Sequence, residues 1–213
     1  MTAWLLPARR ARRSLLCACV IAAVLWSAAV ATAATPGDRD PLEVVREHVG
    51  TAIAVLQDPS YRERDAVQRE RLCAIAHQLF DIETFSRLVL MGRWEDLDRS
   101  GQTEFVNVFG DFLCRYYLSR LQLYYGNEQV DFIGQEIKSD TRATVRASVS
   151  WQGLDIPVEV RMSYRDGRWR AFDVVVSGIS AVLVYRAQFQ PRLLDISPRE
   201  LIDELRQRIA EQG

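Results

Sequence analysis

The hydrophobic pattern of this 213-residue chain changes its period from 3.6 to 2 after the Gly126-Asn127 pair. Before that pair, apolar residues recur at spacings of three and four, which is typical of helices that bury one face. After it, apolar and polar residues alternate between residues 143 and 176, which is typical of strands. A helical half followed by strands with short connections predicts an α+β fold with an antiparallel sheet.

Four helices are predicted in the first half, and most have a capping or stop signal. Asp40-Pro41 begins the first helix and Asp58-Pro59 ends it. Asp81 caps a short third helix, and Asp98 or Ser100 caps the fourth. The fourth carries aromatic side chains between residues 105 and 116, which we expect to be buried. The second helix is expected over roughly residues 64–79, the third to end near Gly92, and the fourth to continue to about Tyr124.

Three strands are predicted over residues 143–151, 156–164 and 169–176, with a weaker one near 130–138. Asp166-Gly167 is a hairpin turn between two of them. Two helices follow. The first covers residues 181–189 and is expected to stop near Pro191, and the second opens with a capping box from Ser197 to Glu200. We therefore expect helices packed over a curved antiparallel sheet.

The first 33 residues have the three parts of a secretory signal peptide. Four arginines between residues 9 and 13 precede an apolar run over residues 15–30, and Ala31-Thr32-Ala33 is a small-x-small cleavage pattern. The apolar run is shorter than the roughly 20 residues that a membrane-spanning helix needs. We expect cleavage after Ala33, a flexible lead-in over residues 34–40 and one mature domain over residues 41–213.

Export changes the charge balance and the cysteine count. Removing four of the 27 basic residues leaves 23 against 28 acidic ones, a net charge of about −5. This argues against nucleic acid as a partner and against tight adhesion to anionic membranes. Cys73 and Cys114 remain, both in apolar helical patterns where a buried thiol is common. We expect two thiols, with a disulfide as the alternative that an oxidising compartment permits.

The mature domain shows no cluster of reactive side chains typical of a catalytic centre. Its two histidines, His48 and His77, lie on predicted helices, and we interpret His77 as a packed or surface residue. The sequence has no His-x-His or Cys-x-x-Cys pair, no glycine-rich phosphate loop after a strand and no Gly-x-Ser-x-Gly. We expect no metal site and no catalytic residue.

Two polar residues in apolar surroundings have competing interpretations. Asp173 interrupts an apolar strand, and the favoured interpretation is a structural acid that pairs with an arginine or with backbone amides. The alternative is an exported enzyme for a small apolar substrate, with Asp173 and Tyr164 as acid and base. Arg186 is interpreted as a latch between a helix and the sheet, and the alternative role is a contact with a lipid headgroup or a partner.

Four strings, in order along the chain, resemble the MlaC (toluene-tolerance) family. They are Phe80-Asp81-Ile82-Glu83-Thr84 with Gly92-Arg93-Trp94; Glu104-Phe105 through Phe109 to Tyr116-Tyr117; Ile156-Pro157-Val158 with Asp166-Gly167-Arg168-Trp169-Arg170; and the run from Phe172 through Ser180 into Tyr185-Arg186-Ala187-Gln188-Phe189. Together these strings span most of the mature domain.

The resemblance implies an NTF2-like curved sheet packed with a helical subdomain, and a cavity between them that holds the acyl chains of a phospholipid. That phospholipid is cargo, and no cofactor is implied. The resemblance also implies a periplasmic shuttle between an outer-membrane lipoprotein complex and an inner-membrane ABC transporter, maintaining outer-membrane lipid asymmetry. We expect it to act as a monomer without catalysis.

Candidate lipid contacts follow from the inward faces of the predicted elements and are not supplied by the family. They are Phe85, Leu88, Phe109, Leu113, Val145, Val149, Val158, Val160, Met162, Phe172 and Val174. Periodicity does not distinguish a cavity from an ordinary packed core. The competing interpretation is therefore an adaptor with a filled core and an exposed apolar patch that binds other proteins.

Overall fold

The computed structural model describes residues 40–211, and the predicted signal peptide and most of the lead-in lie outside them. The helical half contains α2 (Pro41–Gln57), α3 (Asp65–Leu79), α4 (Ile82–Leu90) and α5 (Arg99–Tyr124). The sheet follows, with β1 (Gln129–Ser139), β2 (Arg142–Trp151), β3 (Leu154–Arg165), β4 (Arg168–Val176) and β5 (Ile179–Ser180). The last two helices are α6 (Ala181–Asp195) and α7 (Pro198–Ala210).

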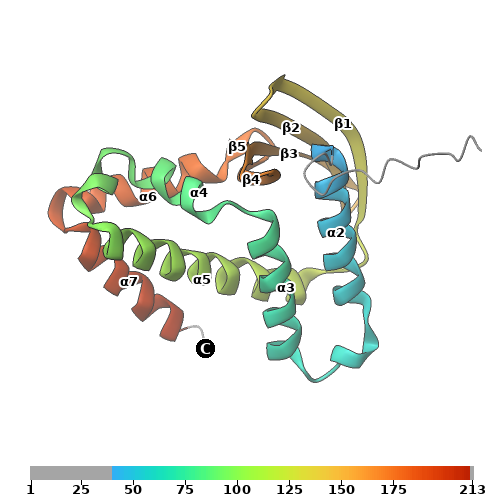
Figure 1. Cartoon of the computed structure of the whole chain (residues 1–213). Coiled ribbons are helices and arrows are strands. Elements are labelled where there is room, and N and C mark those ends of the chain that lie inside the picture. Colours follow the sequence, from blue (N-terminus) through green and yellow to red (C-terminus); the bar gives the residue numbers. More distant parts are fainter. Residues whose placement is uncertain (1–39, 212–213) are drawn as a thin grey trace, which may run out of the picture. The chain divides into compact units, whose positions relative to one another are not determined.

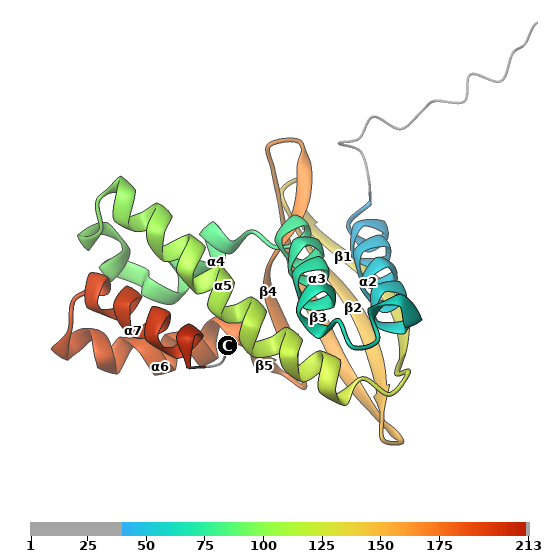
Figure 2. The same ribbon diagram turned by 90° about the horizontal axis from the view of Figure 1, so that it is seen from below.

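The five strands form one antiparallel sheet in the order β1-β2-β3-β4-β5, so each strand pairs with its neighbour in the sequence. This confirms the predicted α+β fold, including the weaker first strand. The two-residue β5 was not predicted, because two residues carry no detectable alternation. The sheet is curved, and α2 and α3 lie across one of its faces (Figures 1 and 2).

The domain has two separate hydrophobic cores. The first joins α4, α5, α6 and α7 around Phe109, whose ring lies 5.2–5.6 Å from those of Phe85, Phe105, Tyr185 and Phe189. Aromatic pairs at such spacings add to the stability from area burial alone. The second core lies between the sheet and helices α2 and α3. Its buried members are Val45, Leu79, Val145, Val160, Met162 and Ala171.

The predicted capping signals form as expected. The Asp40 carboxylate accepts from the Leu42 amide at the start of α2, and Asp98 accepts from the Gly101 amide at the start of α5. Ser197 and Glu200 form a reciprocal capping box at the start of α7. These side chains satisfy amides that have no partner within the helix, and they fix where the helices begin.

Helix α6 does not stop near Pro191, and that prediction is wrong. The helix continues to Asp195 with Pro191 inside it. Proline removes one amide donor from a helix, but Phe189 and Leu193, four residues apart, are both buried in the first core. Gln190 also donates to the Val89 and Leu90 carbonyls at the end of α4. Packing on both sides of the proline therefore outweighs the missing hydrogen bond.

Cys73 and Cys114 form a disulfide, which corrects the expectation of two thiols. The bond joins α3 to α5, which pack against each other and hold the two Cα atoms 5.6 Å apart. This separation lies within the range that a disulfide can span, about 4.4–6.8 Å. The sequence showed that the cysteines are 41 positions apart, but not that their helices would meet.

Candidate functional site

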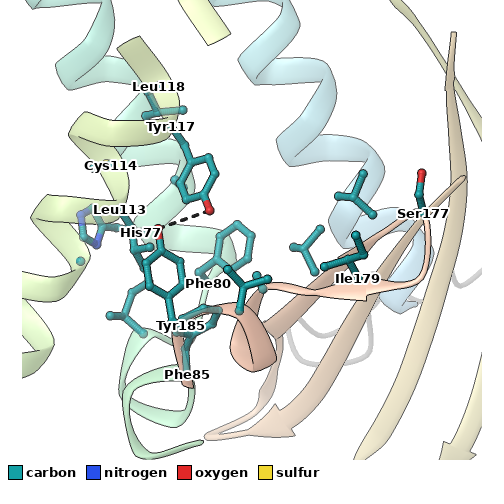
Figure 3. A pocket seen from close by; sticks show the side chains of 17 residues that line it. His77, Phe80, Phe85, Leu113, Cys114, Tyr117, Leu118, Ser177, Ile179 and Tyr185 are labelled. Carbon is teal, nitrogen blue, oxygen red and sulfur yellow. Dashed lines mark hydrogen bonds between the residues drawn. The ribbon is translucent and has the colours of Figure 1, made fainter. Parts of the chain in front are cut away.

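An apolar cavity of about 710 Å³ lies between the two cores (Figure 3). Its walls come from α3, α4, α5, the ends of β4 and β5, and α6. The lining residues are Ala76, His77, Phe80, Ile82, Phe85, Gly110, Leu113, Cys114, Tyr117, Leu118, Val174, Val176, Ser177, Ile179, Ala181, Val184 and Tyr185. The volume lies within the range of about 300–1,000 Å³ that is usual for small-molecule sites.

The cavity has a buried wall and an open rim. Phe85, Cys114 and Tyr185 are buried on the helical side. On the rim, Val176 and Ile179 are 44% and 64% exposed, although both are aliphatic. Exposed apolar side chains around a hollow are typical of a ligand groove rather than of a closed core.

The turn between β4 and β5 places these rim residues. Ser177 and Gly178 have φ values of 49° and 81°, which suit the two central positions of a tight hairpin turn. The turn brings Ile179 back beside Val176, with which it is paired. Ser180 then caps α6 by accepting from the Leu183 amide, so the helix that carries Val184 and Tyr185 begins at the rim.

Gly110 lets α3 and α4 approach α5 closely at the cavity wall. A Cβ atom at this position would lie 3.2 Å from His77 Cε1 and 3.5 Å from Ile82 Cγ2. The first distance is shorter than ordinary van der Waals contact, so any larger residue would push against His77. His77 is exposed and borders the cavity, as its interpretation as a packed or surface residue allows.

The sequence model of the family described as MlaC protein matches residues 46–207. This chain belongs to the MlaC family. The fold is also similar to that of a phospholipid-binding protein from Ralstonia solanacearum, solved in complex with a phospholipid. The TM-score is 0.74 and the identity 20%, over 82% of this chain and 99% of the other. A search of curated proteins found no match.

Three of the eleven predicted lipid contacts line the cavity of this MlaC-family domain: Phe85, Leu113 and Val174. The other eight lie elsewhere. Phe109 is at the centre of the first core, and Leu88 packs against that core. In or against the second core are Val145, Val158, Val160 and Met162, while Val149 is half-buried on β2 and Phe172 lies beneath Arg142. As lipid contacts, all eleven residues stay predictions.

The eight residues lie outside the cavity because an inward face is not the same as a cavity wall. The spacing of apolar residues shows which way a strand or helix faces, but not where a neighbouring element covers it. Helices α2 and α3 cover the middle of the sheet and leave the end of β4 open. Tyr117 and Ile179 were missed for the same reason. An apolar residue beside the Ser177-Gly178 turn was the available signal for Ile179.

Asp173 is a structural acid, as the favoured interpretation predicted. Its carboxylate accepts hydrogen bonds from Arg161 Nη1 at 3.0 Å, Ser180 Oγ at 2.7 Å and the Val182 amide at 3.1 Å. It therefore links β3, β4 and the start of α6, where negative charge is favourable. Neither Asp173 nor Tyr164 is among the residues that line the cavity.

Arg186 is a latch, although it joins α6 to α4 and not to the sheet, which corrects that part of the prediction. Its guanidinium donates from Nε and Nη2 to the Leu88 carbonyl, at 3.0 and 2.7 Å. Carbonyls near a helix end lack partners within the helix, so the guanidinium also satisfies the end of α4. This contact fixes the spacing of two helices that border the cavity.

Residues 40–211 contain neither a metal-binding cluster nor a membrane-spanning helix. In that range, no three His, Cys, Asp or Glu side chains gather in a way that could hold a metal ion. No helix in the same described range is long and apolar enough to cross a bilayer.

Proposed function

We propose that this domain binds a phospholipid, with acyl chains in the cavity between the two cores and the headgroup at the rim. The observation that carries the proposal is a large apolar cavity, open through aliphatic residues, in a domain of the MlaC family. The protein from Ralstonia solanacearum, which shares this fold, is described as phospholipid-binding. A filled core, which the adaptor interpretation needs, is inconsistent with a hollow of this size.

The energy of chain burial is sufficient for tight binding. A diacyl phospholipid has about 30 chain methylenes, and each contributes about 0.8 kcal/mol when it leaves water. The gross sum exceeds the practical ceiling of about 18–21 kcal/mol for non-covalent binding, before the costs of ordering are deducted. Even partial burial of the chains would therefore hold the lipid strongly. Release should be slow until a partner opens the cavity or offers another apolar path.

The wider role follows as part of the same proposal. The chain would be exported by its N-terminal signal peptide and act in the periplasm. It would carry lipid between an outer-membrane lipoprotein complex and an inner-membrane ABC transporter, and so maintain outer-membrane lipid asymmetry. Slow spontaneous release suits such a shuttle, because cargo is then transferred on docking and not lost to the solvent between the membranes.

We further propose that the domain is a carrier and not an enzyme. Its lining residues include one histidine and no Asp, Glu, Lys or Arg, so the cavity offers little for acid–base chemistry. The one buried acid that drew attention in the sequence, Asp173, is fully engaged in structural hydrogen bonds. The exported-enzyme alternative therefore has no supporting site in the described cavity.

The proposal is tested by native mass spectrometry and lipid extraction after mild purification. The wild type should retain phospholipid, or take it up from phosphatidylethanolamine vesicles when delipidated. Val184→Trp fills the cavity from α6 and should reduce bound lipid strongly. Leu183→Trp adds the same side chain at the neighbouring exposed position and should leave binding unchanged. A wild-type protein that neither retains nor takes up lipid would exclude the carrier function.

A further inference from the structure

Two tyrosine hydroxyls form a polar pair in the largely apolar cavity wall. Tyr117 on α5 and Tyr185 on α6 both line the cavity, and their Oη atoms lie 3.3 Å apart (Figure 3). Their rings meet edge to face with centroids 6.5 Å apart. The pair comes from residues 68 positions apart in the sequence, so only the packing of α5 against α6 brings the two hydroxyls together.

The hydrogen bond has a definite direction. The Tyr185 side chain is in the first core, the residue is 3% exposed, and its hydroxyl donates to the Tyr117 hydroxyl. Burial, assisted by the hydrogen bond to Tyr117, raises the pKa of Tyr185 well above its ordinary value of 10.0. Tyr185 therefore stays protonated and donates a hydrogen bond to Tyr117 Oη.

Tyr117 is left with a proton to donate. A phenol carries one O–H donor, and Tyr117 uses its oxygen as the acceptor for Tyr185. Among the described side chains of residues 40–211, the Tyr117 hydroxyl has one hydrogen bond, in which it accepts from Tyr185. Tyr117 is 47% exposed, so water can accept this proton while the cavity is open. Filling the cavity with acyl chains removes that water, and a buried donor without an acceptor is unfavourable.

The acceptor that a phospholipid carries next to its acyl chains is the ester carbonyl, where each chain joins the glycerol. The methylenes below it have no acceptor, and the phosphate above it is hydrated and would stay at the rim. Carboxylates of free fatty acids are less suitable, because the cavity lining contains no lysine or arginine to neutralise them.

We propose that the Tyr117 hydroxyl donates a hydrogen bond to an ester carbonyl of the bound lipid, so that the cavity selects ester-linked over ether-linked glycerophospholipids. Tyr185 is the positioning residue, because the hydrogen bond that it donates holds the Tyr117 oxygen and so orients the Tyr117 hydroxyl. This inference rests on the proposed function and adds the part of the lipid that the cavity recognises.

The test is a competition between two lipids that differ only in the carbonyl. Delipidated protein is incubated with vesicles containing equal amounts of diacyl and dialkyl phosphatidylethanolamine of matched chain length, and bound lipid is quantified by mass spectrometry. The wild type should bind the diacyl lipid about fivefold better, equivalent to ~1 kcal/mol for one net hydrogen bond. Tyr117→Phe should lower this ratio to about one, because the diacyl lipid loses its donor and the dialkyl lipid no longer leaves a donor unpaired.

Two further variants separate the hydrogen bond from general packing effects. Tyr185→Phe should reduce the ratio without abolishing binding of the dialkyl lipid. Tyr116→Phe is the matched control on the same helix, because its ring stacks on Phe112 and it does not line the cavity. It should keep the wild-type ratio.

Infrared spectra with ¹³C-labelled ester carbonyls add a direct measurement. The carbonyl band should shift to lower frequency in the wild type and return toward its unbonded position in Tyr117→Phe. A wild-type ratio of one, or a ratio that Tyr117→Phe leaves unchanged, would overturn this inference while lipid binding itself stands. If the wild type binds neither lipid, the proposed function fails instead.

Discussion

Breaking the Cys73–Cys114 disulfide should destabilise the domain by an amount that can be worked out from the structure. The bond closes a loop with a sequence separation of 41 residues, from the middle of α3 to the middle of α5. In the chain-entropy account, the cross-link restricts the unfolded chain by an amount that grows with the logarithm of loop length. For this loop the contribution is about 4 kcal/mol at 25 °C.

The perturbation can be made chemically and by mutation. Reduction of the wild type and the double substitution Cys73→Ala/Cys114→Ala should both lower the free energy of unfolding by about 4 kcal/mol. For a domain of this size, a loss of about 4 kcal/mol corresponds to a decrease in Tm of about 8–16 °C. Far-UV circular dichroism during thermal and urea unfolding measures the change.

Two controls test whether the loss of stability is caused by breaking the cross-link. Reductant should have no effect on the double alanine variant, and thiol titration of the oxidised wild type should find no free thiol among the two cysteines. If the oxidised and reduced wild type differ in Tm by less than about 2 °C, the loop-closure reasoning is refuted. Residual contacts between the two cysteine segments in the unfolded chain would give such a result.

Two further predictions concern acidic residues. Asp173→Ala should cost about 3 kcal/mol in urea unfolding, since the Ser180 hydroxyl and the Val182 amide lose their acceptor. Arg161→Ala removes a partner that is 41% exposed and should cost under about 1 kcal/mol. If the two substitutions lowered the free energy of unfolding equally, the structural role of Asp173 would be contradicted. The Ser197 amide, and then its hydroxyl, lower the pKa of Glu200 below its ordinary value of 4.5. The cap therefore stabilises the fold above pH 4.5, and this contribution is lost as pH falls through the folded-state pKa. Glu200→Gln should make the free energy of unfolding less dependent on pH in the acid range. An unchanged pH dependence would contradict the role of Glu200 in the cap.

Local signals in the sequence were enough to predict the order of the elements. The change of period after Gly126-Asn127 places the helices before the sheet, and caps such as Asp98 and Ser197 determine where helices begin. These features depend on residues a few positions apart, so they do not depend on how the rest of the chain packs. The resemblance in motifs added the family, which the match over residues 46–207 confirms.

The features that the sequence did not predict depend on how the helices and strands pack together. Whether Cys73 meets Cys114, whether α6 continues past Pro191, and which apolar residues face a cavity all depend on how helices pack on one another and on the sheet. The sequence determined which faces are apolar, since that is a matter of spacing along one element. Only the tertiary structure decided that two cores form with a hollow between them, because α2 and α3 cover the middle of the sheet and leave the end of β4 beside α5 and α6 uncovered.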